Sequence, residues 1–309
     1  MQKITLGSSD VRVSRIILGM MRISQMDSPS IRELFDSARA LGIDYFDHAD
    51  IYGGSPHRCE TLFGEAVQLT AQDRSEVVLQ SKVGIRNGFF DFSKEHILDS
   101  VNGSLRALKT DYLDVLLLHR PDALVEPEEV ATAFDQLSAE GKVRKFGVSN
   151  HTPGQIELLK IAVNQPLVAN QIQLSVAHAP SIASGLSANM ANLEQSVDRD
   201  GEVVTYSRLN SITLQAWSPF QGALTGGIFL GNLQSYGALN TALDEIAAEY
   251  GVTPSAIAVA WITRHPANMQ VVLGTTNPVR LADGVAGADI KLTREQWYKL
   301  YKAGGYVLP

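Results

Sequence analysis

Four side chains that could move or stabilise a proton stand at or just after short apolar runs of the sequence: Asp47, Tyr52, Lys82 and His119. A buried lysine needs a carboxylate partner, and Asp47 is the nearest candidate for Lys82. A lysine ammonium beside a tyrosine hydroxyl favours the phenolate and lowers the tyrosine pKa from its reference value of about 10. These residue types therefore predict general acid catalysis with Tyr52 as the proton donor.

Each of these residues also has a simpler interpretation when it is taken alone. A strand-terminal aspartate usually caps a helix or binds a loop, a single histidine such as His119 is more often structural, and a single lysine lies most often on the surface. Asp50 is the main alternative to Asp47 as the partner of the lysine, whereas Asp44 is expected at the opposite end of its strand. The position of all four residues at the ends of consecutive runs favours a catalytic function.

Short β-rich runs alternate with helical patterns along the chain. Some runs, such as 77–79 and 115–118, are continuous in apolar residues, which is typical of parallel strands buried on both faces. The eight runs are Arg15–Gly19, Tyr45–Ala49, Val77–Lys82, Leu113–His119, Phe146–Asn150, Ala169–Leu174, Thr213–Pro219 and Met269–Gly274. Their alternation with helices predicts an α/β fold, a (β/α)8 TIM barrel, in which the C-terminal strand ends surround one mouth. Residues that follow the second, third and fourth strands would meet there.

The predicted helices begin and end at capping residues. Ser28-Pro29 begins one helix, with a cap residue and a proline in the first turn, and Gly42 ends it. The other helices are predicted at Lys94–Leu108, Pro127–Ala139, Pro153–Val163, Leu239–Tyr250 and Pro254–Arg264.

Segments outside the repeat are assigned to an N-terminal β-hairpin at Ile4–Ser14, long loops at the C-terminal mouth at Ser175–Leu209 and Ser218–Ala238, and an extra C-terminal helix at Thr293–Lys302. No linker divides the chain, so residues 1–309 are expected to form one domain.

Composition excludes several classes of function. The chain has 309 residues, of which 45% are hydrophobic, and a net charge of −7, which leaves no global field to hold nucleic acid or an anionic membrane. Cys59 is the only cysteine, and the seven histidines show no metal-binding spacing, so neither an intramolecular disulfide nor a metal site is expected. The N-terminus lacks an apolar stretch and no run is long enough to span a membrane, which predicts a soluble, cytoplasmic protein.

The strand-terminal motifs resemble those of the aldo-keto reductase superfamily, in family order and over nearly the whole chain. FDHADIYG at 46–53 is similar to the family's strand-two signature, SK at 81–82 to its lysine segment and LLH at 117–119 to its histidine segment. The resemblance implies that Asp47, Tyr52, Lys82 and His119 form a catalytic tetrad that reduces aldehydes or ketones. His119 would orient the carbonyl oxygen and assist proton transfer.

The resemblance also implies a nicotinamide cofactor. Ser149, Asn150 and Gln171 would bind its carboxamide, Trp217 would stack on its ring, and the glycine-containing segment 218–227 would fold over its pyrophosphate. The residues expected to contact the cofactor are Gly19, Met20, Asp47, Ser149, Asn150, Gln171, Trp217, Ser218, Pro219, Phe220, Gly222, Leu224, Gly274, Thr275, Thr276 and Arg280. Substrate contacts are expected from Met21, Tyr52 and His119.

The segment 274–280 resembles the one that holds the adenosine 2′-phosphate of NADPH. Asn277-Pro278 begins a helix, whose N-terminus attracts anions, and Arg280 could add a charge-assisted bond to a phosphate. Many family members carry lysine at the position of Gly274 and asparagine at that of Gly284. The arginine and the two threonines nevertheless favour NADPH over NADH.

Two alternatives stand beside this interpretation. YKLYK at 298–302 matches the Tyr-x-x-x-Lys motif of short-chain dehydrogenases, but it lies at the extreme C-terminus and no Gly-x-Gly-x-x-Gly follows an early strand. A cofactor-sensing binding subunit on the same barrel, as in potassium-channel β subunits, would keep the tetrad with little turnover. The expected partner is a small carbonyl substrate, and the oligomeric state stays open, with a monomer compatible.

Overall fold

Eight parallel strands close into a barrel in the computed structural model, which describes residues 1–223 and 226–309. Around the barrel the strands follow one another in sequence order, and the last pairs with the first through Val271–Leu273 and Ile16–Leu18. The barrel strands are β3 (Ile16–Gly19), β4 (Tyr45–Asp47), β5 (Val78–Val83), β8 (Leu113–Leu118), β9 (Val143–Ser149), β10 (Leu167–Gln173), β11 (Thr213–Trp217) and β12 (Gln270–Leu273). The predicted (β/α)8 barrel is confirmed, with each strand within a few residues of its predicted bounds.

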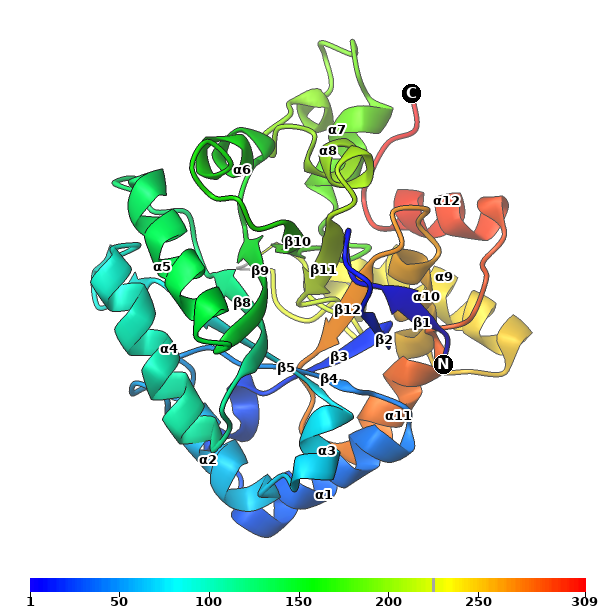
Figure 1. Cartoon of the computed structure of the whole chain (residues 1–309). Coiled ribbons are helices and arrows are strands. Elements are labelled where there is room, and N and C mark those ends of the chain that lie inside the picture. Colours follow the sequence, from blue (N-terminus) through cyan, green and yellow to red (C-terminus); the bar gives the residue numbers. More distant parts are fainter. Residues whose placement is uncertain (224–225) are drawn as a thin grey trace.

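Helices form a ring around these strands (Figure 1). They are α1 (Ser28–Ala40), α2 (Arg58–Val67), α3 (Ala71–Ser75), α4 (Lys94–Leu108), α5 (Pro127–Ala139), α6 (Pro153–Leu159), α7 (Pro180–Leu186), α8 (Val203–Leu209), α9 (Leu233–Tyr250), α10 (Pro254–Thr263), α11 (Pro278–Ala286) and α12 (Arg294–Ala303), with 3₁₀ turns at Met21–Gln25 and Glu194–Ser196. Among the described residues, no helix is both long enough and apolar enough to cross a membrane.

Some predicted helix limits are wrong. The side chain of Asp27, not Ser28, caps α1 by accepting a hydrogen bond from the Ser30 amide. Helix α6 ends at Leu159, and α9 begins at Leu233, with a non-helical backbone at Tyr236.

The predicted hairpin closes the N-terminal end of the barrel. Strands β1 (Lys3–Thr5) and β2 (Arg12–Ser14) pair antiparallel, and in Figure 1 the dark blue hairpin lies to the right of the centre, near β12. Asp44 lies at this end, as expected, where its carboxylate is 2.7 Å from Lys3 Nζ and accepts a hydrogen bond from the Ser14 amide.

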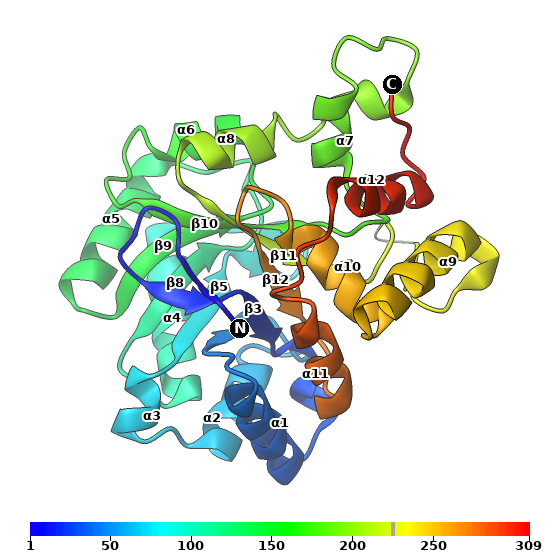
Figure 2. The same ribbon diagram turned by 90° about the vertical axis from the view of Figure 1, so that its right-hand side faces the viewer.

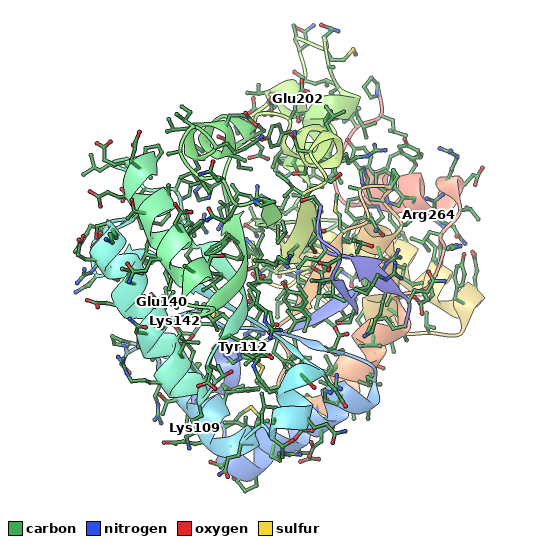
Figure 3. The ribbon with its side chains drawn as sticks, in the orientation of Figure 1. Lys109, Tyr112, Glu140, Lys142, Glu202 and Arg264 are labelled. Atoms are coloured by element: carbon green, nitrogen blue, oxygen red, sulfur yellow. The ribbon has the colours of Figure 1, made fainter. Side chains whose placement is uncertain are left out.

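The residue before β8 packs against an arginine. Figure 3, in the orientation of Figure 1, labels this residue, Tyr112, whose ring centroid lies 3.7 Å from the Arg74 guanidinium.

The expected long loops are wrong in part, because Ser175–Leu209 contains helices α7 and α8 and Ser218–Ala238 contains the start of α9. The C-terminal segment ties the region after β10 to the barrel. Helix α12 confirms the expected extra helix and packs against α9. Figure 2 shows that the chain then runs toward α7, where the Tyr306 hydroxyl accepts the Ala179 amide at 2.5 Å and the Gln195 side chain pairs with the backbone of Val307.

The barrel interior changes from apolar to polar toward the C-terminal mouth. On β5 the side chains of Val78, Gln80 and Lys82 alternate with outward-facing ones, so that all three point inward. Val78 belongs to the apolar cluster of the interior, the amide of Gln80 lies in a hydrogen-bonded layer above it, and Lys82 lies above that layer. The two-residue period of the strand thus places the Lys82 ammonium at the C-terminal mouth of the barrel.

Candidate active site

Lys82 is the centre of the polar groups at the mouth. Its side chain is fully buried, and its ammonium donates to Asp47 Oδ2 at 2.7 Å, to the His48 carbonyl at 2.9 Å and to the Tyr52 hydroxyl oxygen at 2.9 Å. All three ammonium protons are therefore used. Because Tyr52 accepts a bond from the ammonium, its own proton is left to be donated into the mouth.

A layer of glutamines holds Asp47 from below. Asp47 Oδ1 accepts from Gln80 Nε2 at 2.6 Å and from Gln171 Nε2 at 3.1 Å, and both amides also donate to Gln215 Oε1. Gln215 in turn donates to Gln270, which donates to the backbone. Our sequence analysis did not predict this layer. Glutamine occurs within strands β5, β10, β11 and β12, but no pattern along the chain shows that these side chains meet.

Asp50, the alternative partner of Lys82, forms no hydrogen bond with that lysine among the described contacts. Its Oδ2 accepts from the Ser100 hydroxyl at 2.5 Å, while Oδ1 is buried with no hydrogen-bond partner among the described residues. Burial raises the pKa of Asp50 to about 6, against the opposing effect of the Ser100 hydrogen bond. The structure therefore places Asp47, and not Asp50, against Lys82.

The expected direction of the Tyr52 pKa shift is wrong for this state of the protein. Burial raises the pKa of Tyr52 above its ordinary value, and the nearby Lys82 ammonium only partly opposes that effect. Burial also acts to lower the pKa of Lys82, but the Asp47 carboxylate and Tyr52 raise it above the ordinary value. At neutral pH the lysine is thus charged and the tyrosine keeps its proton.

His119 lies beside the tyrosine as a neutral ring. The two ring centroids are 5.9 Å apart in an edge-to-face arrangement. Burial, followed by the charges of Lys82 and Arg120, lowers the pKa of His119 well below its usual range. A neutral imidazole can bind an oxygen through its N–H but is a weak proton source.

The residues expected around the carboxamide are brought together by three neighbouring strands. Ser149 Oγ donates to the Gln171 carbonyl at 2.8 Å, and Asn150 Nδ2 donates to Ser149 Oγ at 2.8 Å. Asn150 Oδ1 accepts the indole N–H of Trp217 at 3.0 Å. Trp217 is half-buried at the end of β11, so its ring is held in place with part of its surface at the mouth.

The segment after β11 is fastened to its surroundings. Ser218 has a left-handed backbone, with φ 52°, and Pro219 is buried. Phe220 pairs with Phe229 through the backbone, and the Gly222 carbonyl accepts from Gln173 Nε2 at 3.0 Å. Leu224, also expected at the cofactor, lies outside the described residues.

The end of β12 presents side chains rather than free helix amides. Asn277 Oδ1 accepts from the amides of Val279 and Arg280, so the cap itself occupies the first-turn donors on which the anion-binding expectation partly rested. Thr275 and Thr276 are half-buried and the Arg280 side chain is exposed. These hydroxyls and this guanidinium are the groups that could hold a phosphate.

Gly274 and Gly284, where many family members carry lysine and asparagine, differ in the space around them. A Cβ added at Gly274 would meet nothing within 4 Å, so a longer side chain is tolerated there. A Cβ at Gly284 would lie 2.8 Å from Leu273 Cδ1, so that leucine fills the space an asparagine would need.

The first strand end contributes a residue that we did not predict. Gly19 is followed by Met20, which is buried and donates its amide to the Asp47 carbonyl, and by Met21, which is half exposed. Arg22, in the turn that follows, donates to the Gly274 carbonyl at 3.3 Å. This guanidinium stands beside the position where the family often has lysine.

A cavity of about 270 Å³ opens at the mouth on the side of β8 to β11. Arg120, Asn150, His151, Gln173, Trp217 and Asp200 are among its lining residues. Neither Arg120 nor Asp200 was predicted as a site residue. Within the described part of the chain, no group of three or more His, Cys, Asp or Glu side chains could hold a metal ion.

The geometry agrees with comparisons to known proteins. A model of the aldo/keto reductase family matches residues 15–304, and the chain belongs to that family of oxidoreductases. The uncharacterized oxidoreductase YcsN of Bacillus subtilis (strain 168) is 35% identical, over 100% of this chain and 100% of its own length. A 6-dehydroglucose reductase of Agrobacterium fabrum (strain C58) is 34% identical, over 97% of each chain. The thermostable aldo-keto reductase Tm1743, solved with the inhibitor epalrestat, shares the fold at a TM-score of 0.78 and 24% identity, over 98% of this chain and 100% of that one.

Proposed function

We propose that this protein reduces aldehydes or ketones to alcohols with NADPH, and that Tyr52 is the general acid. The observation that carries the proposal is the direction of the hydrogen bond from the Lys82 ammonium to the Tyr52 oxygen, which leaves the phenol proton for the substrate. The similarity to a protein named 6-dehydroglucose reductase supports a carbonyl substrate.

Each residue of the tetrad has a different role in the proposed carbonyl reduction. The bound nicotinamide would supply the hydride. Tyr52 donates its proton to the carbonyl oxygen as negative charge develops there, and the resulting phenolate is stabilised by the Lys82 ammonium at 2.9 Å. Asp47 keeps that ammonium charged and in place. His119, being neutral, orients the carbonyl oxygen through its ring N–H, so the proton comes from the tyrosine.

The residues at the mouth fit a nicotinamide dinucleotide with an additional phosphate. Trp217 offers an anchored aromatic surface for the nicotinamide, and Gln171 has its amide nitrogen engaged, which leaves its oxygen to accept from the carboxamide. Near Gly274, the Arg280 and Arg22 guanidinium groups and the Thr275 hydroxyl would hold the 2′-phosphate. NADH lacks that phosphate and would bind more weakly.

Replacement of Tyr52 by phenylalanine tests the proposal. We expect kcat for an aldehyde panel to fall by about 10²–10⁴, which is the usual contribution of a general acid, with the Kd for NADPH nearly unchanged. Tyr250→Phe, at a surface hydroxyl, is the matched control and should retain activity. Near wild-type turnover in Tyr52→Phe would exclude Tyr52 as the acid. Tight NADPH binding by the wild-type protein with no turnover would instead favour the cofactor-sensing subunit.

A further inference from the structure

Arg120 is a cation at the mouth for which the described residues provide no anionic partner. It follows His119 directly at the end of β8 and is half-buried. No carboxylate of the described chain lies within 4.0 Å of its guanidinium, and no hydrogen bond from it to these residues is present. Burial lowers the pKa of Arg120, but an arginine starts from so high a value that the group stays charged.

The Arg120 guanidinium lines the small cavity at the mouth, together with Asn150 and Trp217. That cavity, of about 270 Å³, has room for a compact molecule and not for a dinucleotide. The Arg120 guanidinium carbon lies 5.8 Å from the centroid of the Trp217 ring. The ring expected to carry the nicotinamide and the unpaired cation therefore bound the same space.

The closed strand order separates Arg120 from the expected phosphate site. Strand β8 is four strands from β12 in either direction around the barrel, so the two strand ends lie on opposite sides of the mouth. Arg280 follows β12, whereas Arg120 follows β8. An anion held by Arg120 is thus a different group from the 2′-phosphate.

We propose that Arg120 binds an anionic group of the substrate and that the protein prefers short-chain oxo acids to neutral aldehydes and ketones. The planar guanidinium fork matches a carboxylate in a two-bond geometry. Asp200 also lines the cavity, and its carboxylate would repel an anion that lies away from Arg120. Arg120 directly follows His119, whose ring centroid lies 5.9 Å from that of Tyr52, so the carbonyl of such a substrate would lie a few bonds from its carboxylate. This inference rests on the proposed function.

The test compares ω-oxo acids of two to five carbons, from glyoxylate to 5-oxopentanoate, with their methyl esters. For the wild-type protein we expect kcat/KM for at least one acid to exceed that for its ester by about tenfold, the usual effect of one charge-assisted bond. Arg120→Met should reduce this ratio to about one, mainly through KM, without changing the Kd for NADPH. Arg120→Lys keeps the charge but loses the fork, so the ratio should be intermediate.

A binding measurement separates this inference from the proposed function. By calorimetry, 4-hydroxybutanoate should bind the NADP⁺-loaded wild-type protein and bind Arg120→Met about tenfold more weakly, while Arg294→Met on α12 should match the wild type. Loss of binding in Arg120→Met without any turnover would overturn the reductase and support the acid site. Equal reduction of acids and esters by the wild type, or an acid preference that survives Arg120→Met, would overturn the acid site alone.

Discussion

The ion pair between Lys82 and Asp47 should dominate the stability of the mouth. The lysine side chain is 0% exposed and that of the aspartate 3%, with 2.7 Å between Nζ and Oδ2. Removing one partner of a buried pair leaves the other charge without compensation, which typically costs about 3–5 kcal/mol. We therefore expect Lys82→Met and Asp47→Asn each to lower the free energy of unfolding by about 3–5 kcal/mol.

The double variant gives the sharper result. Lys82→Met combined with Asp47→Asn removes both charges, so its loss should be close to that of one single variant, with a coupling energy of at least about 2 kcal/mol. Urea denaturation followed by circular dichroism measures all four free energies. Additive losses, within about 0.5 kcal/mol, would refute the argument that the pair is desolvated and mutually compensated.

An exposed pair is the matched control for this cycle. Arg32 and Asp36 form an i,i+4 ion pair with a 2.9 Å separation, and both side chains are about half exposed. Arg32→Met and Asp36→Asn should show a coupling energy in the range of about 0–1 kcal/mol, because solvent screens the charges. Similar coupling in the two cycles would mean that burial contributes nothing to the interaction.

Two further predictions concern a buried acid and the cofactor site. Burial raises the pKa of Asp50 to about 6. The favourable contribution of this carboxyl group to the free energy of unfolding is therefore present below the unfolded-state pKa of about 4 and is lost as pH rises through 6. Asp50→Asn should thus gain about 2 kcal/mol of stability relative to the wild type between pH 4 and 7 in urea titrations, and a pH-independent difference would contradict this. Gly274→Lys adds a cation in open space, so the ratio of NADPH affinity to NADH affinity in fluorescence titrations should rise about fivefold. The control Gly154→Lys, also in open space, should leave this ratio unchanged. An equal gain in affinity for both cofactors would show that the lysine at position 274 does not contact the 2′-phosphate.

The barrel could be predicted because its signals are local. Continuous apolar runs indicate strands buried on both faces, and capped helices such as α4 and α10 carry their start signals in the sequence. Helices α2, α3, α7 and α8 were not predicted: α2, α7 and α8 begin without a side-chain cap, and α3 has a capping box but only five residues. Their position depends on packing against the barrel, which a pattern along the chain does not contain.

The approach of Lys82 to Asp47 could be predicted because adjacent strands bring their ends together. The glutamine layer could not, since Gln80, Gln171 and Gln215 face one another only after the barrel closes. The shift of the Tyr52 pKa was predicted with the wrong sign for a related reason. Spacing placed a cation beside the hydroxyl, but it gave no measure of how far burial would oppose that cation.

Charge at the mouth would allow an acidic protein to bind the proposed anionic cofactor and the proposed anionic substrate. The net charge of −7 gives no general attraction for phosphates. The buried Lys82 is neutralised by Asp47, so this lysine does not attract an anionic ligand either. Among the other cations at the mouth, Arg280 follows β12 and Arg22 donates to the nearby Gly274 carbonyl, whereas Arg120 follows β8 on the opposite side of the barrel. In the proposed arrangement, the guanidinium groups on these two sides would orient two different anions across the same opening. Raised salt should therefore weaken the binding of each ligand independently, because the two sites do not share a charged partner.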